Sequence, residues 1–158
     1  MLIGEKEKPR MDNRSFHFID LGHLFERILR SWEAKEVRHL GAPQGVVTHL
    51  ALERMVTLTG ALNGILVVRS TREFAVWLRS QRENSPLGRY PEDEVYEELI
   101  SLYCLYLFHD FWRPHLFQIG PINPFVSIPH DWPEEALTSA CCLTVEGFPV
   151  EIRLWLKD

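Results

Sequence analysis

The C-terminal run 149–156 constrains the fold most, because its side chains alternate strictly in character. One face of an extended chain there would hold four aliphatic residues, Val150, Ile152, Leu154 and Leu156. The other face would hold Glu151, Arg153 and Trp155. A period of two is typical of a strand with one buried face, so we expect Glu151 and Arg153 to be exposed. A turn at Glu146-Gly147 would pair this strand with the run 137–145 in a hairpin.

A second hairpin is predicted between Met55 and Val68. Two runs rich in β-branched and aliphatic residues, 55–60 and 62–68, flank a glycine-containing turn. Asn63-Gly64 is a strong tight-turn signal, although the turn could lie anywhere from Gly60 to Gly64. The β-branched run 46–52 predicts a further strand just before this hairpin.

Three segments, 18–35, 71–82 and 92–112, have the apolar period of an amphipathic helix. Ser70 and Glu73 form a capping-box pattern at the start of the second helix. The third helix begins after Pro91 with three carboxylates in its first turn, where they complement the helix dipole. Prolines and a glycine recur through 114–134, so we expect an irregular connection there.

The order helix, strands, helix, helix, strands predicts an α+β fold of two layers, with long helices packed on one antiparallel sheet. Each half of the chain contains a long helix followed by a strand hairpin, which suggests an internal duplication. With 158 residues and 46% hydrophobic residues, the chain can bury one core. We expect residues 1–14 to form a disordered, solvated tail and residues 15–158 to form a single domain.

Composition excludes several classes of protein. The formal net charge of −5 lacks the basic footprint of a nucleic-acid-binding protein. The longest apolar run, 102–108, is too short to cross a membrane, and the N-terminus lacks the apolar segment of a secretory signal. Three cysteines without C-x-x-C spacing indicate reduced thiols, so we expect a cytoplasmic protein that does not bind membranes.

No metal site is expected from the spacing of the histidines. The densest group is His109, Asp110 and His115, but Pro114 interrupts any helix between them. The two histidines also lack the i,i+4 spacing of a helical ligand pair. None of the common nucleotide-binding, serine-hydrolase or zinc-protease motifs occurs either.

The predicted helix 92–112 has a polar stripe formed by Glu94, Glu98 and Ser101. The opposite side, expected to be buried, holds Val95, Leu99, Leu102, Tyr103 and Tyr106. One interpretation is a solvated first turn of a helix that becomes buried where Leu105 and Phe108 continue the stripe. The other is an acidic face displayed to a protein partner.

The hairpin Met55–Val68, followed by a helix from Ser70, resembles the β-hairpin and helix of the CheC/CheX/FliY family of chemotaxis phosphatases. The second half is also similar, with an acidic-start helix, a connection containing Pro121 and Pro129, and a terminal hairpin. The resemblance covers about 18–157 and implies a CheX-like fold. It also implies a homodimer formed through a sheet edge.

The active helix of that family has an acidic or Ser residue, a Glu four residues later and an Asn three further on. These positions correspond to Glu94, Glu98 and Ser101, so the resemblance implies Glu98 and Ser101 as catalytic residues and Glu94 and Glu98 as partner-binding residues. Glu98 would contact the active-site lysine of a phosphorylated response-regulator receiver domain, and the family's Asn holds the attacking water. The chain itself would need no cofactor, because the receiver domain would supply Mg²⁺.

Ser101 departs from the family pattern, because it offers one hydroxyl on a short stem in place of a carboxamide. In the helix 18–35, Glu26 is followed three residues later by Leu29, so that half has no water-positioning residue. Two hypotheses stay open: a weakened phosphatase acting on the phospho-aspartate of a receiver domain, and a non-catalytic interaction or dimerisation module. A small-molecule enzyme ranks below both, because no convergent set of polar residues suggests a pocket.

Overall fold

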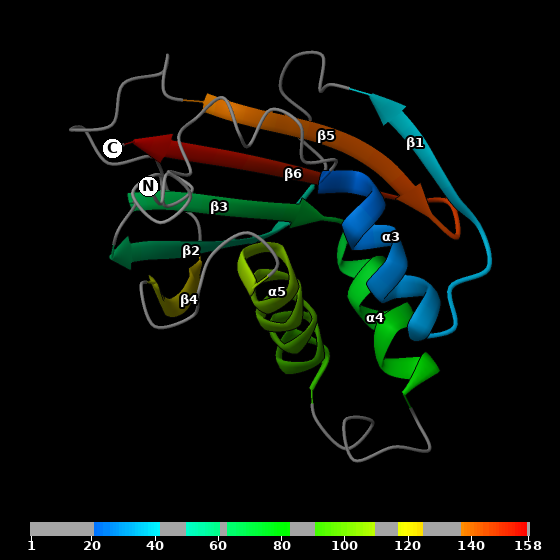
Figure 1. Cartoon of the computed structure of the whole chain (residues 1–158). Coiled ribbons are helices and arrows are strands. Elements are labelled where there is room, and N and C mark those ends of the chain that lie inside the picture. Colours follow the sequence, from blue (N-terminus) through cyan, green and yellow to red (C-terminus); the bar gives the residue numbers. More distant parts are fainter. Residues whose placement is uncertain are drawn as a thin grey trace, which may run out of the picture.

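The structure, a computed structural model, describes residues 21–41, 50–60, 63–82, 91–109, 117–124 and 137–157. The strands are β1 (Val37–Gly41), β2 (Leu52–Gly60), β3 (Asn63–Ser70), β4 (Phe117–Pro124), β5 (Leu137–Val145) and β6 (Phe148–Lys157). The helices are α3 (Leu21–Ser31), α4 (Arg72–Gln81) and α5 (Glu92–His109). The described helices lie on one face of a single antiparallel sheet, which confirms the predicted α+β class (Figure 1).

The sheet has the strand order β1-β5-β6-β3-β2-β4. Exchanging β1 with β4, β2 with β5 and β3 with β6 reverses this order and leaves it otherwise unchanged. Each half of the chain therefore contributes a helix, an edge strand and a central hairpin, and each edge strand pairs with the hairpin of the other half. This symmetry is the arrangement expected of an internal duplication, with α3 and α5 in equivalent places.

The main core lies between the helices and the sheet. It contains Val150, Ile152, Leu154 and Leu156 of β6, which confirms the predicted buried face of this strand. Phe25 of α3 packs edge-on against Tyr103 of α5, with ring centroids 5.0 Å apart. The Tyr103 hydroxyl donates to the Leu21 carbonyl oxygen at 2.9 Å, so the two equivalent helices are joined by both apolar and polar contacts.

The other face of β6 is less exposed than predicted. Glu151 is completely buried, Trp155 is nearly so, and the Arg153 side chain is only 26% exposed. The Glu151 Oε1 accepts hydrogen bonds from Arg153 Nε at 2.8 Å and from Arg69 Nη1 at 3.2 Å. The prediction that Glu151 is exposed was therefore wrong, because two arginines satisfy its charge within a covered surface.

Several element boundaries differ from the predictions. Helix α3 ends at Ser31 instead of residue 35, because Glu33 adopts a left-handed conformation and the Ala34 amide bonds back to the Leu29 carbonyl. The predicted capping box does not form: Thr71 is the N-cap residue of α4, and the Ser70 hydroxyl donates to the Thr71 carbonyl oxygen instead.

The first hairpin is confirmed: β2 ends at Gly60 and β3 begins at Asn63, so the predicted turn pair Asn63-Gly64 belongs to β3. The tail 1–14 and most of the predicted strand 46–52 lie outside the described residues.

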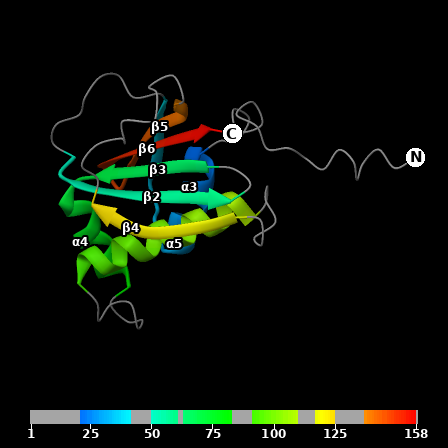
Figure 2. The same cartoon turned by 90° about the vertical axis from the view of Figure 1, so that its left-hand side faces the viewer.

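The segment 114–134 is not entirely irregular, because it contains the strand β4. Figure 2 shows β4 at the sheet edge beside α5. An edge strand tolerates Pro121 and Pro124, since only one of its sides must supply hydrogen bonds. In the pairing with β2, Gly120 and Pro121 together lie opposite the single residue Thr57, which forms a β-bulge.

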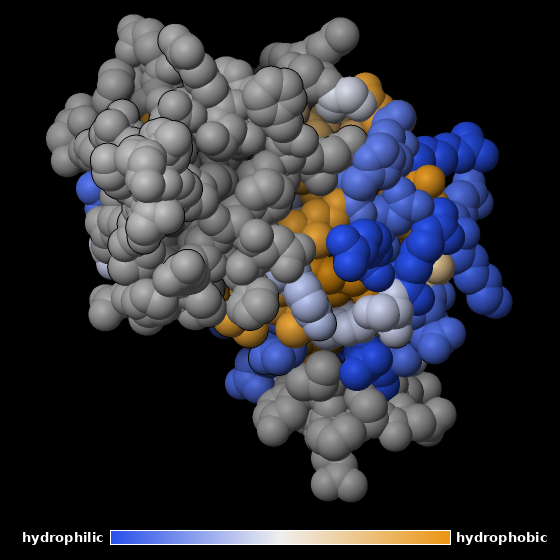
Figure 3. Space-filling model, viewed as in Figure 1, coloured by the Kyte–Doolittle hydropathy of each residue, from blue (hydrophilic) through white to orange (hydrophobic). Residues whose placement is uncertain are grey.

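Among the described residues, no helix is long and apolar enough to cross a membrane. Figure 3 shows that the described surface around α3 and β1 is mostly hydrophilic.

Candidate functional site

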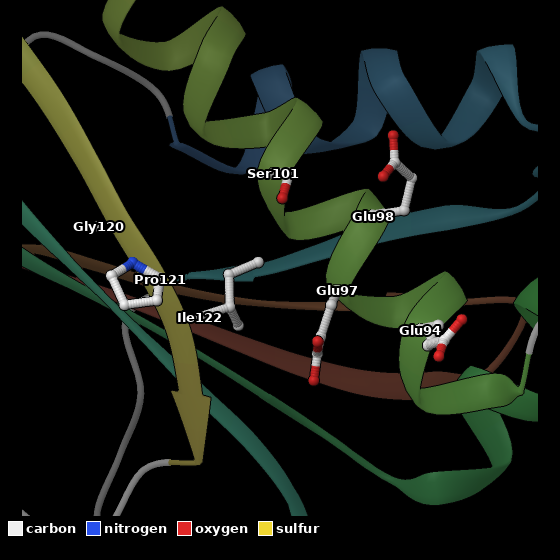
Figure 4. Close-up of a pocket in the computed structure, with 7 residues that line it drawn as sticks. All are labelled: Glu94, Glu97, Glu98, Ser101, Gly120, Pro121 and Ile122. Carbon is white, nitrogen blue, oxygen red and sulfur yellow. The ribbon is translucent and has the colours of Figure 1, made fainter.

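An open groove of about 380 Å³ lies between α5 and β4. Its lining residues are Glu94, Glu97, Glu98 and Ser101 of α5 and Gly120, Pro121 and Ile122 of β4. Figure 4 shows the three glutamates extending from one helix, with the proline and isoleucine on the neighbouring strand. All three site residues expected from the sequence therefore line one groove.

The stripe of Glu94, Glu98 and Ser101 lies on the outer side of α5. Both carboxylates are exposed and Ser101 is half-buried, whereas Val95 and Leu99 on the opposite side are buried. This placement agrees with the predicted polar stripe.

Two apolar residues beyond Ser101 are exposed: Leu105, which continues the stripe, and Tyr106, which belongs to the opposite side of the helix. Leu105 is 56% exposed and Tyr106 is 48% exposed, so the prediction that Tyr106 is buried was wrong. The side chain of Phe108 lies outside the described residues. The helix thus does not become buried beyond Ser101 at these two positions, and an acidic surface adjoins an apolar one.

Arg54 of β2 fixes the start of α5 against the sheet. Its Nε donates to Glu97 Oε2 at 2.8 Å, its Nη2 lies 3.3 Å from Asp93 Oδ2, and its Nη1 donates to the Glu53 carbonyl oxygen at 2.9 Å. Sequence patterning did not reveal the contacts with Glu97 and Asp93, because they join residues 43 and 39 positions apart. The only local signal was the single cation of a strand that also contains Glu53, Thr57 and Thr59.

The ion pairs divide the carboxylates of α5 into two groups. Asp93 is held by Arg54 and by Arg72, whose Nη1 lies 2.7 Å from Asp93 Oδ1, and Glu97 is held by Arg54. The carboxylates of Glu94 and Glu98 have no hydrogen-bond or ion-pair partner among the described residues. The charge available to a partner in this groove is therefore that of Glu94 and Glu98, and it favours a cationic group.

The bulge in β4 sets the opposite wall of the groove. A Cβ atom at Gly120 would lie 2.9 Å from the Thr57 carbonyl oxygen, closer than normal van der Waals contact. Glycine at this position lets β4 approach β2 closely and places Pro121 and Ile122 opposite α5. The sequence placed this segment in an irregular connection, so this wall was not anticipated.

The histidine group considered in the sequence differs from the group that the described residues bring together. Asp110, His115 and the side chain of His109 lie outside the described residues. Within the described part of the chain, the group able to hold a metal ion is His23, Glu26 and His39. The described residues that line the groove between α5 and β4 form no such group, and the polar side chains among them are carboxylates and one hydroxyl.

No known family model and no curated protein sequence matches this chain. Solved structures match it in fold. CheX from Borrelia burgdorferi, in a CheX–CheY–BeF3–Mg²⁺ complex, has a TM-score of 0.56 and 15% identity, with 94% of this chain and 100% of that chain covered. CheX from Vibrio vulnificus has a TM-score of 0.57 and 12% identity, with 89% and 99% covered.

A more distant match is the FliM–SpeE complex from H. pylori, with a TM-score of 0.51 and 8% identity, covering 94% of this chain and 88% of that chain. The agreement extends over nearly the full length of both CheX structures and includes the sheet with its long helices. This chain therefore has the CheX/CheC-like fold.

Proposed function

We propose that this chain is a chemotaxis-type signalling protein that binds the receiver domain of a response regulator through the groove between α5 and β4. The observation that carries the proposal is the position of Glu94 and Glu98, which are exposed, without described partners, and on one stripe with Ser101. A structure of the same fold contains CheX together with CheY, which supports a CheY-type receiver domain as the class of partner.

The groove suits a partner that presents a lysine. Two unpaired carboxylates one helical turn apart attract a cation and steer its approach. Leu105 on the stripe and Tyr106 beside it add exposed apolar area near the C-terminal end of the same helix. Aromatic and apolar groups beside a charged rim are typical of protein–protein interfaces, so the helix offers both parts of a docking surface.

For the chemistry we propose a slow hydrolysis of the receiver's aspartyl phosphate. Water would attack phosphorus, the bond from phosphorus to the aspartyl oxygen would break, and the products would be the free carboxylate and inorganic phosphate. Such a reaction depends on positioning more than on covalent catalysis. Glu98 would accept a hydrogen bond from the receiver's lysine, and the receiver would hold the Mg²⁺ that stabilises charge on the phosphoryl oxygens.

Ser101 would be the group that orients the water, since it stands where the family has an asparagine. Its hydroxyl ends one bond closer to the helix than the amide of an asparagine would, and its one donor and its acceptor share a single oxygen, whereas an amide has two donors and a separate acceptor. The half-buried position of Ser101 shortens its reach further. These properties support a weakened phosphatase.

The second candidate is a module that binds its partner without catalysis. Ser101 in place of an amide favours it, and so does the occurrence of the fold in a FliM–SpeE complex, since one fold can serve several binding functions. The homodimer formed through a sheet edge also stays a prediction.

The deciding experiment measures the half-lives of phosphorylated receiver domains with the wild-type protein, Ser101→Asn and Ser101→Ala. Positioned water-orienting groups typically contribute ~10²–10⁴-fold, so even an imperfectly aligned amide should shorten the half-life. A gain with Asn and a loss with Ala would support a phosphatase that uses the serine hydroxyl. If all three proteins leave the receiver's own decay rate unchanged while binding persists, the non-catalytic module is correct.

A further inference from the structure

We propose that His23, Glu26 and His39 form a binding site for a first-row divalent metal ion of the zinc class. His23 and Glu26 are three residues apart on α3, which places them on one side of the helix. His39 comes from β1, the strand at one edge of the sheet. The site thus joins a helix to an edge strand through three side chains of the types that bind zinc.

The three side chains are already close enough to share an ion. One ligand atom from each lies within 4.8 Å of the other two, and the rings of His23 and His39 have centroids 4.5 Å apart. Ligands at the usual zinc distances are separated by about 3.3 Å in a tetrahedron. Small side-chain rotations would therefore bring all three into coordination, with His39 Nε2 moving away from Glu26 Oε1, which now lies 2.6 Å from it.

The Glu26 carboxylate, at the centre of the site, is held in place by a second partner on its other oxygen. Glu26 uses Oε1 toward His39 and Oε2 toward Arg30, whose Nε lies 2.6 Å away. Arg30 also donates to the Lys35 carbonyl oxygen at 3.2 Å, in the connection between α3 and β1. A partner that fixes the second oxygen of a ligating carboxylate orients the first, and such outer contacts strengthen metal binding.

The connection that brings His39 to the helix is also fixed. A carboxylate oxygen of Glu146, in the turn between β5 and β6, accepts hydrogen bonds from the amides of Lys35 at 2.6 Å and Glu36 at 2.7 Å. The register of β1 against β5 then places His39 opposite Leu143. Little ordering would thus be needed on binding, because the backbone of both ligand-bearing elements is already in place.

The ligand set selects the class of metal. Two imidazoles and one carboxylate suit Zn²⁺, Co²⁺, Ni²⁺ and Cu²⁺, whereas Mg²⁺ and Ca²⁺ prefer sites built only from oxygen. Three protein ligands leave a fourth position for water, as in open zinc sites. The two histidines are exposed and Glu26 lies at the surface, so an ion could enter directly from solvent.

The site occupies the counterpart of the groove between α5 and β4, since the symmetry of the sheet relates α3 to α5 and β1 to β4. In that half, Leu29 takes the place of a polar residue three positions after Glu26, so the docking stripe is absent there. A bound ion would instead tie α3 to the edge strand and stabilise the folded state by mass action.

The test titrates Co²⁺ and Zn²⁺ into the full chain without a polyhistidine tag, following Co²⁺ absorption and the melting temperature. We expect about one tightly bound ion per chain, a rise in the melting temperature with Zn²⁺, and no response to Mg²⁺ or Ca²⁺. His23→Ala and Glu26→Gln should each weaken Co²⁺ binding at least ~10-fold. Because His23 is exposed, its alanine variant should fold normally, which its melting temperature in EDTA will verify.

A matched control is the double variant His109→Ala/His115→Ala, which removes the two histidines of the group considered in the sequence and leaves the proposed ligands intact. It should bind Co²⁺ as the wild type does. The proposal is overturned if the wild type binds no ion, if His23→Ala and Glu26→Gln bind as tightly as the wild type, or if only the control variant loses binding.

Discussion

Arg54 holds α5 against the sheet and so determines where Glu94 and Glu98 are displayed. We predict that Arg54 and Glu97 are energetically coupled. A double-mutant cycle with Arg54→Met and Glu97→Gln will measure the coupling free energy. Methionine keeps most of the buried side-chain volume but removes the cation, and glutamine removes only the charge of the glutamate. The cycle therefore isolates the ion pair between Nε and Oε2, which lie 2.8 Å apart.

The solvent exposure of the two side chains determines how large the coupling free energy should be. Hydrogen bonds to charged groups contribute ~1.5–3 kcal/mol when shielded, whereas exposed ion pairs contribute ~0–1 kcal/mol. The Arg54 side chain is 12% exposed and that of Glu97 is 37% exposed, so the pair lies between these cases. We expect a coupling of ~0.5–1.5 kcal/mol.

The single change Arg54→Met should cost more than the coupling, at ~1–3 kcal/mol, because the contacts with Asp93 and the Glu53 carbonyl are lost as well. For a chain of this length, that corresponds to a fall in melting temperature of ~2–12 °C. Urea unfolding of the wild type, both single variants and the double variant gives all the required free energies.

The matched control is the exposed pair of Arg38 and Glu36, which lie 2.9 Å apart near the other edge of the sheet. The same cycle there should give a coupling of no more than ~0.5 kcal/mol. A coupling near zero for Arg54 and Glu97 would refute the view that this contact fixes α5. So would equal couplings for the two pairs.

Two further predictions concern the walls of the groove and the proposed metal site. Gly120→Ala should destabilise the protein by ~1–3 kcal/mol in urea unfolding, because the new Cβ atom would meet the Thr57 carbonyl oxygen at 2.9 Å. The control Asn123→Ala, at an exposed position of β4, should cost less than ~0.5 kcal/mol. Equal losses of stability in the two variants would argue against the close approach of β4 to β2. The hydrogen bond from His39 lowers the pKa of the Glu26 carboxyl below 4.5 in the folded state. The ionised carboxylate therefore stabilises the fold above pH 4.5, and this contribution is lost as the pH falls through the lowered pKa. In EDTA, the difference in unfolding free energy between the wild type and Glu26→Gln should therefore shrink below pH 4.5, and a difference independent of pH would contradict this account.

The elements with strong periodicity could be predicted from the sequence. The alternation in β6 and the turn at Glu146-Gly147 led directly to the C-terminal hairpin, and the helical period of 92–112 located α5 and its polar stripe. In these cases one side of the element is buried, so the spacing of apolar residues in the sequence indicates which face is covered.

Two elements of the sheet could not be predicted in the same way. Pro121 and Pro124 argued against a strand, and only the position of β4 at an edge makes them compatible with one. Edge position depends on the whole topology, which no local pattern encodes. The short strand β1, with one half-buried residue and four exposed ones, has no alternation to reveal it.

The remaining differences arise from contacts between distant residues. Glu151 looks like a solvent-facing position in an alternating strand, yet Arg69 and Arg153 make its burial possible. The contact of Arg54 with Glu97 and the convergence of His23 with His39 likewise depend on tertiary packing. The residues of the stripe could be identified from the sequence, whereas the wall opposite them and the cation that holds α5 against the sheet could not.

The most direct test of the proposed function measures the affinity of a receiver domain, loaded with beryllofluoride and Mg²⁺, for the wild-type protein and for Glu98→Lys. Placing a lysine where a carboxylate should meet the receiver's lysine creates a like-charge contact that costs several kcal/mol. We therefore predict that the affinity falls at least ~10-fold, equivalent to about 1.4 kcal/mol. Glu73→Lys, an equal charge change at an exposed position of α4 outside the groove, should bind as the wild type does. Equal affinities for the wild type and Glu98→Lys would contradict the assignment of this groove as the receiver-binding surface.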